Sequence, residues 1–73
     1  MFKKGDLVNF NKKFKDGYEN LIFSDSILVK SFNDGNVLLE KFYYMDKLSG
    51  DKTWANNFWI DAQHVCLSNK QYA

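Results

Sequence analysis

Short runs of apolar and aromatic residues, separated by polar turns, set the pattern of this chain. Alternation of apolar and polar positions over about four to eight residues predicts half-buried strands. The pattern predicts five strands, at residues 5–10, 21–32, 37–45, 53–60 and 65–67. We therefore expect an all-β fold.

The strongest local signal is a hairpin between the second and third strands, at residues 33–36. A glycine after Asp34 supplies the positive φ that tight hairpin turns need. Two registers are open, and they place opposite side chains on each face because strands have a period of two. A two-residue turn pairs Phe32 with Val37 and Val29 with Glu40, which mixes charged and apolar groups on both faces. A three-residue turn, with Gly35 at a bulge, separates them better, and its pairs are Val29 with Leu39, Ser31 with Val37 and Ile27 with Lys41.

This preferred register predicts two unlike faces for the hairpin. The inner face carries Ile27, Val29, Val37, Leu39, Tyr43 and Met45. The outer face carries Leu28, Lys30, Phe32, Leu38, Glu40, Phe42 and Tyr44. The outer face is unusually apolar for a surface that meets solvent.

The remaining segments are polar. Residues 11–20 show neither a helical nor a strand period, so we expect a mobile loop in which Phe14 and Tyr18 contact the body. Residues 61–64 are too few for an α-helix and predict one 3₁₀ turn before the last strand. Residues 68–73 are predicted to be a frayed tail.

Length and composition place the chain among small globular domains. Its 73 residues, 45% of them hydrophobic, predict one domain spanning 1–73. Cys66 is the single cysteine, so no disulfide can form within the chain. Because no apolar run approaches the roughly 20 residues of a membrane span and no secretion signal is evident, we expect a cytoplasmic protein without a membrane partner.

The order of predicted elements resembles the SH3-like barrel. The opening segment 2–8 is similar to the first strand of many small bacterial and phage barrels of this type, and 59–67 is similar to their closing turn and strand. The resemblance implies a five-stranded SH3-like barrel that binds a ligand and has a 3₁₀ turn before its last strand. The chain has no proline and no adjacent tryptophan pair, so the ligand preference of SH3 domains is not carried over. An OB-like five-stranded barrel is the competing fold.

The chemistry-bearing side chains do not predict an active site. His64 and Cys66 are two residues apart, but a zinc site needs three or four ligands and the chain has one histidine and one cysteine. A Cys–His nucleophilic pair would need an orienting group and an oxyanion site in an enclosed pocket. We expect no catalysis, no metal and no cofactor.

Thirteen aromatic residues are more than so small a barrel can enclose, so some of them must lie on its surface. Two interpretations stay open: loops and the N-terminal segment cover the outer face of the hairpin, or that face is an exposed contact patch. In the second case the partner is another protein, or a second copy in a homodimer, and the module suits a phage or mobile-element protein that inhibits a factor in the host cytoplasm. The predicted anchors are Leu28, Phe32, Leu38, Phe42, Tyr44 and Trp54.

The alternative partner is a nucleic acid. Five of the ten lysines lie within the first fifteen residues, and they could form a basic strip beside an aromatic ring for base stacking. The absence of arginine counts against sequence-specific recognition. The residues of this alternative site are Lys3, Lys4, Lys12, Lys13, Lys15 and Tyr18.

Overall fold

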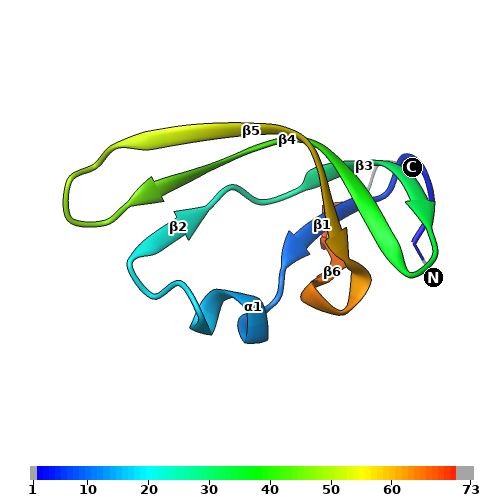
Figure 1. The fold of residues 1–73 in the computed structure, drawn as a ribbon, viewed down its shortest axis with the longest axis horizontal. Coiled ribbons are helices and arrows are strands. Elements are labelled where there is room, and N and C mark those ends of the chain that lie inside the picture. Colours follow the sequence, from blue (N-terminus) through cyan, green and yellow to red (C-terminus); the bar gives the residue numbers. More distant parts are fainter. Residues whose placement is uncertain (1, 71–73) are drawn as a thin grey trace.

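The computed structural model describes residues 2–70 and is predominantly β (Figure 1). Its elements follow in the order β1 (Leu7–Phe10), α1 (Lys12–Asp16), β2 (Leu21–Phe23), β3 (Ile27–Asn33), β4 (Asn36–Asp46), β5 (Lys52–Asp61), η1 (Ala62–His64) and β6 (Val65–Leu67). The predicted all-β class is confirmed, as are the 3₁₀ turn and the last strand.

The strands form one antiparallel sheet around β4. The early part of β4 pairs with β3 and its later part with β2, while β5 runs along its other edge. β3 also pairs with β1, which in turn pairs with β6. The sheet has six strands and is not closed, which corrects the expected five-stranded barrel.

The segment expected as one strand at 21–32 is two strands because the backbone turns at Ser26. Its φ is +52°, and its backbone N–H donates to the Asn9 side-chain oxygen at 2.7 Å. Ser24 still pairs with Tyr43, since its N–H donates to the Tyr43 carbonyl at 3.0 Å. Just past this turn Ile27 and Leu28 pair with β1, where Ile27 lies opposite Val8 rather than Lys41, and the ladder with β4 resumes at Val29.

The β3–β4 hairpin combines both registers considered for it. Asp34 and Gly35 have φ of +51° and +77°, which is the two-residue turn with positive φ at both positions. Near the turn Phe32 therefore pairs with Val37, and the expected pair of Ser31 with Val37 is wrong. A bulge after Val29 then shifts the ladder by one residue.

Beyond that bulge the predicted pair of Val29 with Leu39 is confirmed, and both side chains are fully buried. The turn at Asp34 and Gly35 determines the pairing next to the turn, and the burial of Val29 and Leu39 determines the pairing beyond the bulge. One extra residue in β3, Lys30, reconciles them.

A crease crosses β4 and β5 where Glu40 and Asn57 fall out of the ladder. Pairing passes from Leu39–Phe58 to Lys41–Asn56, and Asn57 has φ +53°. One residue of each strand is left without a ladder partner at the crease. The side chains that point toward the core and the cleft therefore change from odd to even positions along β4. Phe42 is therefore buried, which corrects its expected place on the outer face. The same change corrects two expected inner residues, Tyr43 and Met45, which are only half-buried.

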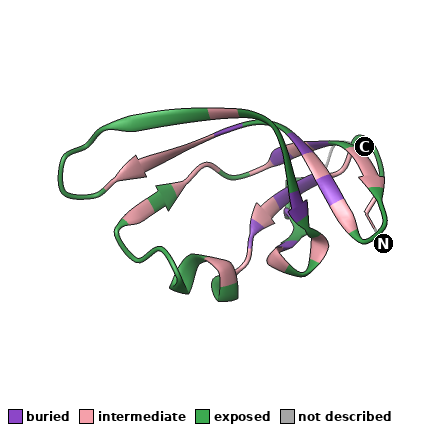
Figure 2. Cartoon of the chain, viewed as in Figure 1, coloured by how far each residue is buried: buried purple, intermediate pink, exposed green. Residues whose placement is uncertain are grey.

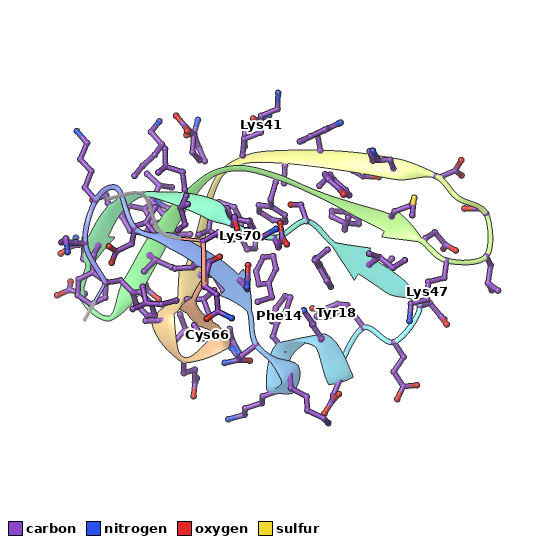
Figure 3. The ribbon with its side chains drawn as sticks, turned by 180° about the vertical axis from the view of Figure 1, so that it is seen from behind. Phe14, Tyr18, Lys41, Lys47, Cys66 and Lys70 are labelled. Carbon is purple, nitrogen blue, oxygen red and sulfur yellow. The ribbon has the colours of Figure 1, made fainter. Side chains whose placement is uncertain are left out.

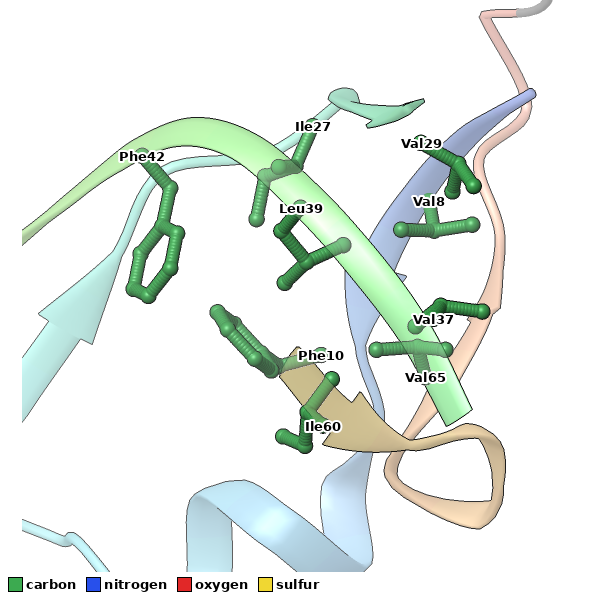
Figure 4. Packing of buried hydrophobic residues seen from close by; sticks show 9 residues of the cluster. All are labelled: Val8, Phe10, Ile27, Val29, Val37, Leu39, Phe42, Ile60 and Val65. Carbon is green, nitrogen blue, oxygen red and sulfur yellow. The ribbon is translucent and has the colours of Figure 1, made fainter. Parts of the chain in front are cut away.

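The core lies toward one end of a molecule that measures 35 × 22 × 22 Å (Figure 2). Among the described aromatic residues, only two are buried, and both belong to this core. The distal part of the β4–β5 hairpin extends away from it (Figure 1). The core side chains in Figure 4 are Val8, Phe10, Ile27, Val29, Val37, Leu39, Phe42, Ile60 and Val65.

Two polar segments are more ordered than expected. Residues 12–16, expected within a mobile loop, form α1 because the Asn11 side chain caps the helix by accepting from the Phe14 N–H at 3.0 Å. Ser68, expected in the frayed tail, is buried, and its N–H donates to the Leu7 carbonyl at 2.8 Å. Residues 71–73 of that expected tail lie outside the described residues.

Candidate binding site: an aromatic cleft

An open cleft of about 310 Å³ lies between α1, β2 and the β4–β5 hairpin. Seven of its nine lining residues are aromatic. Figure 3 shows Phe14 and Tyr18 pointing from α1 and the turn after it toward the sheet. The lining residues are Phe10, Phe14, Tyr18, Leu21, Phe23, Phe42, Tyr44, Ala55 and Phe58.

One wall of the cleft is the α1 segment, which hydrogen bonds hold against the body. The Asn11 N–H donates to the His64 carbonyl at 2.9 Å, and its side-chain amide donates to the Gln63 carbonyl at 2.6 Å. Phe14 then stacks on Phe10, with ring centroids 4.6 Å apart and planes 19° from parallel. The start of the helix is thus tied to η1, and its single inward ring lies on the core.

The floor of the cleft is a set of rings in mutual contact. Phe10 contacts Phe23 and Phe42, with centroids 4.9 and 5.1 Å apart. Phe23 continues the set to Tyr44 at 6.2 Å. Edge and tilted contacts of this kind add to the stability that burial provides, so the floor continues the packing of the core.

The rim of the cleft is formed by two exposed aromatic residues on opposite walls. Tyr18 is 48% exposed and contacts Phe14, with centroids 5.0 Å apart. Phe58 is 42% exposed and contacts the buried ring of Phe42 at 5.6 Å. Each rim ring thus has one side packed on the protein and one side open to an incoming group.

The described lining offers little polar chemistry. Its side-chain heteroatoms are the hydroxyl groups of Tyr18 and Tyr44, and none of the nine lining residues carries a charge. An apolar or aromatic group would gain free energy on entering, because it would remove both its own surface and the exposed rings from water. The cleft therefore suits apolar side chains.

Three of the aromatic residues predicted as protein anchors lie on the β4–β5 hairpin and divide between its two faces. Phe42 and Tyr44 line the cleft. Trp54, whose strand neighbour Ala55 lines the cleft, lies on the opposite face. The other three predicted anchors are half-buried and do not line the cleft, namely Leu28, Phe32 and Leu38.

The face opposite the cleft combines aromatic rings with lysines. Trp54 packs edge-on against Tyr43, with ring centroids 5.1 Å apart. The Lys41 ammonium lies 4.8 Å from the Trp54 ring centroid, and that of Lys52 lies 4.4 Å from the Tyr43 centroid. These cation–π contacts hold two positive charges on the face of the β4–β5 hairpin opposite the cleft.

The N-terminal lysines lie at the two ends of β1. Lys3 precedes β1 and Lys12 follows it, so the roughly 13 Å length of a four-residue strand separates the two groups. Lys3 pairs with Asp6 at 3.8 Å and Lys12 with Asp16 at 2.9 Å. Lys4, Lys13 and Lys15 are exposed, and Tyr18 of the alternative nucleic-acid site turns instead toward the cleft.

His64 and Cys66 lie near the helix side of the cleft but outside its lining. The His64 ring lies 5.5 Å from the Phe14 ring, and its Nδ1 is buried without a hydrogen-bond partner in the described chain. Cys66 is exposed. Within residues 2–70, no group of three or more His, Cys, Asp or Glu side chains could hold a metal ion.

Sequence reasoning missed most of the cleft, although one signal for it was present. Phe10, Phe14 and Tyr18 are spaced by four, which is a helical period, and Asn11 before Lys12 is a typical helix cap. No comparable signal marks Phe23 and Phe58, because their approach depends on the crease and on the pairing of β2 with β4.

Comparison of the chain with protein-family models, with curated proteins and with solved structures found no match in any of the three. Among the described residues, no helix has the length and apolarity needed to cross a membrane.

Proposed function

We propose that this chain is a non-catalytic binding module that takes apolar side chains of an exposed protein segment into the aromatic cleft. The observation that carries the proposal is the lining: an open cleft of about 310 Å³ with seven aromatic residues and no charged one. This volume is near the lower end of the roughly 300–1,000 Å³ range of ligand pockets. It suits a few side chains of a peptide segment.

The charges beside the cleft favour a partner segment that also carries acidic groups. With Lys12 paired to Asp16, the other exposed charges of this segment are Lys13 and Lys15, which flank Phe14, and Glu19, which follows Tyr18, so positive charge exceeds negative. Aromatic residues enclosed by a polar rim are where binding free energy concentrates in protein interfaces. The exposed lysines would then steer the partner and set its orientation.

We also propose that the chain is a divergent, open member of the SH3-like fold. The support is its order of elements: β1, a long connection, the antiparallel meander β3–β4–β5, a 3₁₀ turn, and a last strand that returns to β1. Binding modules are common among small β folds, but the fold alone does not identify a ligand.

Selection from a displayed library of random linear peptides tests the proposed cleft. We expect the enriched peptides to share an aromatic or long aliphatic anchor with acidic neighbours. Tyr18→Ala and Phe58→Ala should each weaken binding of an enriched peptide by roughly tenfold or more, because aromatic anchors carry much of the free energy of binding in protein interfaces. Both side chains are exposed at the rim, so folding should survive.

Trp54→Ala is the matched control for these variants. It removes an aromatic side chain that is 52% exposed, on the opposite face of the same hairpin. Its affinity for the peptide should equal that of the wild type. Equal losses in all three variants, or no enrichment of apolar anchors, would contradict the proposed cleft.

A further inference from the structure

The outer edge of β5 is unpaired in the described chain. β5 is ten residues long and forms its ladder with β4 alone. Figure 2 shows it exposed along nearly its whole length. An exposed edge strand presents a row of N–H and C=O groups that another strand can pair with, and this one contains no proline.

The sequence of β5 is complementary to itself when it is read in opposite directions. With Asn57 left out of the ladder, as it is in the pairing with β4, Asn56 lies at the centre of the strand. An antiparallel copy centred there places Lys52 opposite Asp61 and Trp54 opposite Trp59. The complete set of pairs is Lys52 with Asp61, Thr53 with Ile60, Trp54 with Trp59, Ala55 with Phe58, and Asn56 with Asn56 of the second copy.

This register also keeps each pair on one face of the sheet. Trp54 and Trp59 pair with Tyr43 and Leu38 of β4, on the face away from the core and the cleft. Ala55 and Phe58 both line the cleft. The pairing depends on the crease. If Asn57 stayed in the ladder, the two residues of each pair would point to opposite faces of the sheet.

We propose that two copies of this chain associate through β5, edge to edge and antiparallel, about a two-fold axis at Asn56. The contact joins the two sheets and forms two Lys52–Asp61 ion pairs and two Trp54–Trp59 pairs between the copies. The tryptophans are 52% and 48% exposed in the single chain, so both have surface to bury. Cross-strand pairs of aromatic residues and of opposite charges stabilise antiparallel sheets. A two-fold contact of this kind uses the same surface twice and closes on itself.

This inference is independent of what occupies the cleft. It does, however, place Ala55 of one copy opposite Phe58 of the other, so the two clefts would lie side by side across the axis. A failed peptide selection would not argue against the association of two copies, and a monomeric protein would not argue against the proposed function of the cleft.

Sedimentation equilibrium of charge-reversal variants tests the association. Lys52→Asp places two aspartates opposite each other at both ends of the contact, and Asp61→Lys does the same with two lysines. Each variant alone should self-associate roughly tenfold more weakly than the wild type. An equimolar mixture should recover the association as a heterodimer, because each mixed contact again pairs a lysine with an aspartate.

Two further variants keep the test informative. Lys47→Asp makes the same charge change in the β4–β5 turn, away from the edge, and should associate as the wild type does. Asp61 also accepts from the Gln63 N–H at 3.0 Å, so Asp61→Asn removes the charge but retains the acceptor if Asp61→Lys folds poorly. Asp61→Asn should associate more weakly than the wild type. A wild type that stays monomeric at its highest soluble concentration, or a mixture no more associated than its components, overturns the proposal.

Discussion

Asn57 sets the position of the crease in the β4–β5 hairpin. Its φ of +53° lies in the left-handed region, which asparagine tolerates better than other residues with a side chain. Its side-chain oxygen accepts from the Lys30 ammonium at 2.9 Å, which links the crease to the β3 bulge. A local conformational preference of one residue thus separates the core part of the hairpin from the cleft part.

Asn57→Val should lower the free energy of unfolding by about 1–2 kcal/mol, because a β-branched residue is strained at positive φ. Urea unfolding measures this change. Asn56→Val is the matched control, since Asn56 is also exposed but pairs regularly with Lys41. Valine favours strands, so the control should be neutral or slightly stabilising. Equal losses at the two positions would show that the left-handed conformation is not the cause.

At the scale of elements, α1 shows how a very short helix can be fixed by its ends. Five residues are too few for a stable isolated helix. The Asn11 cap, the bonds from Asn11 to the η1 segment and the stacking of Phe14 on Phe10 supply the stability that the helix lacks. The cleft wall therefore depends on one asparagine.

Asn11→Ala should destabilise the protein by about 1–2 kcal/mol and loosen α1, since it removes the cap and the side-chain bond to Gln63. Thermal unfolding measures the stability, and the NMR chemical shifts of Phe14 and Tyr18 measure the position of the wall. Asn11→Asp keeps the cap acceptor and should recover part of the loss. If the aspartate variant is no better than the alanine variant, capping contributes little.

The strands could be predicted from the sequence where a local pattern determines them. Alternation identified the extent of β4 and β5 to within one or two residues, and β6 to the residue. The helix α1 was not predicted because its five residues include one apolar side chain, Phe14, which is too few to show a helical period. The division of 21–32 into two strands depends on a hydrogen bond from Ser26 to Asn9, seventeen residues earlier, which no local pattern encodes.

At the scale of the whole molecule, the core and the cleft share Phe10 and Phe42, and the other cleft residues lie outside the buried core. Leu39, Val29 and Val8 are fully buried on the core side of the crease. Beyond it the hairpin carries mostly exposed residues (Figure 2). The cleft could not be predicted from the sequence because it exists only where α1, β2 and the hairpin meet. The sequence did predict an excess of aromatic residues at the surface.

Amide hydrogen exchange should therefore be uneven along β4. At low protein concentration, hydrogen-bonded amides before Glu40 should exchange at least about tenfold more slowly than those after Lys41, because segments with few buried contacts open locally at lower free energy. Exchange measured by NMR resolves the two groups. Uniform protection along the strand would indicate that the hairpin opens only with the whole domain.

The crease also has an evolutionary consequence. Residues at the rim, such as Tyr18 and Phe58, contribute exposed surface to the cleft and do not belong to the buried core that contains Val29 and Leu39. Mutational drift at the rim can then alter partner preference while selection for folding acts on the buried core residues. We expect descendants of this sequence to diverge fastest around the rim and to retain an asparagine or glycine at the position of Asn57.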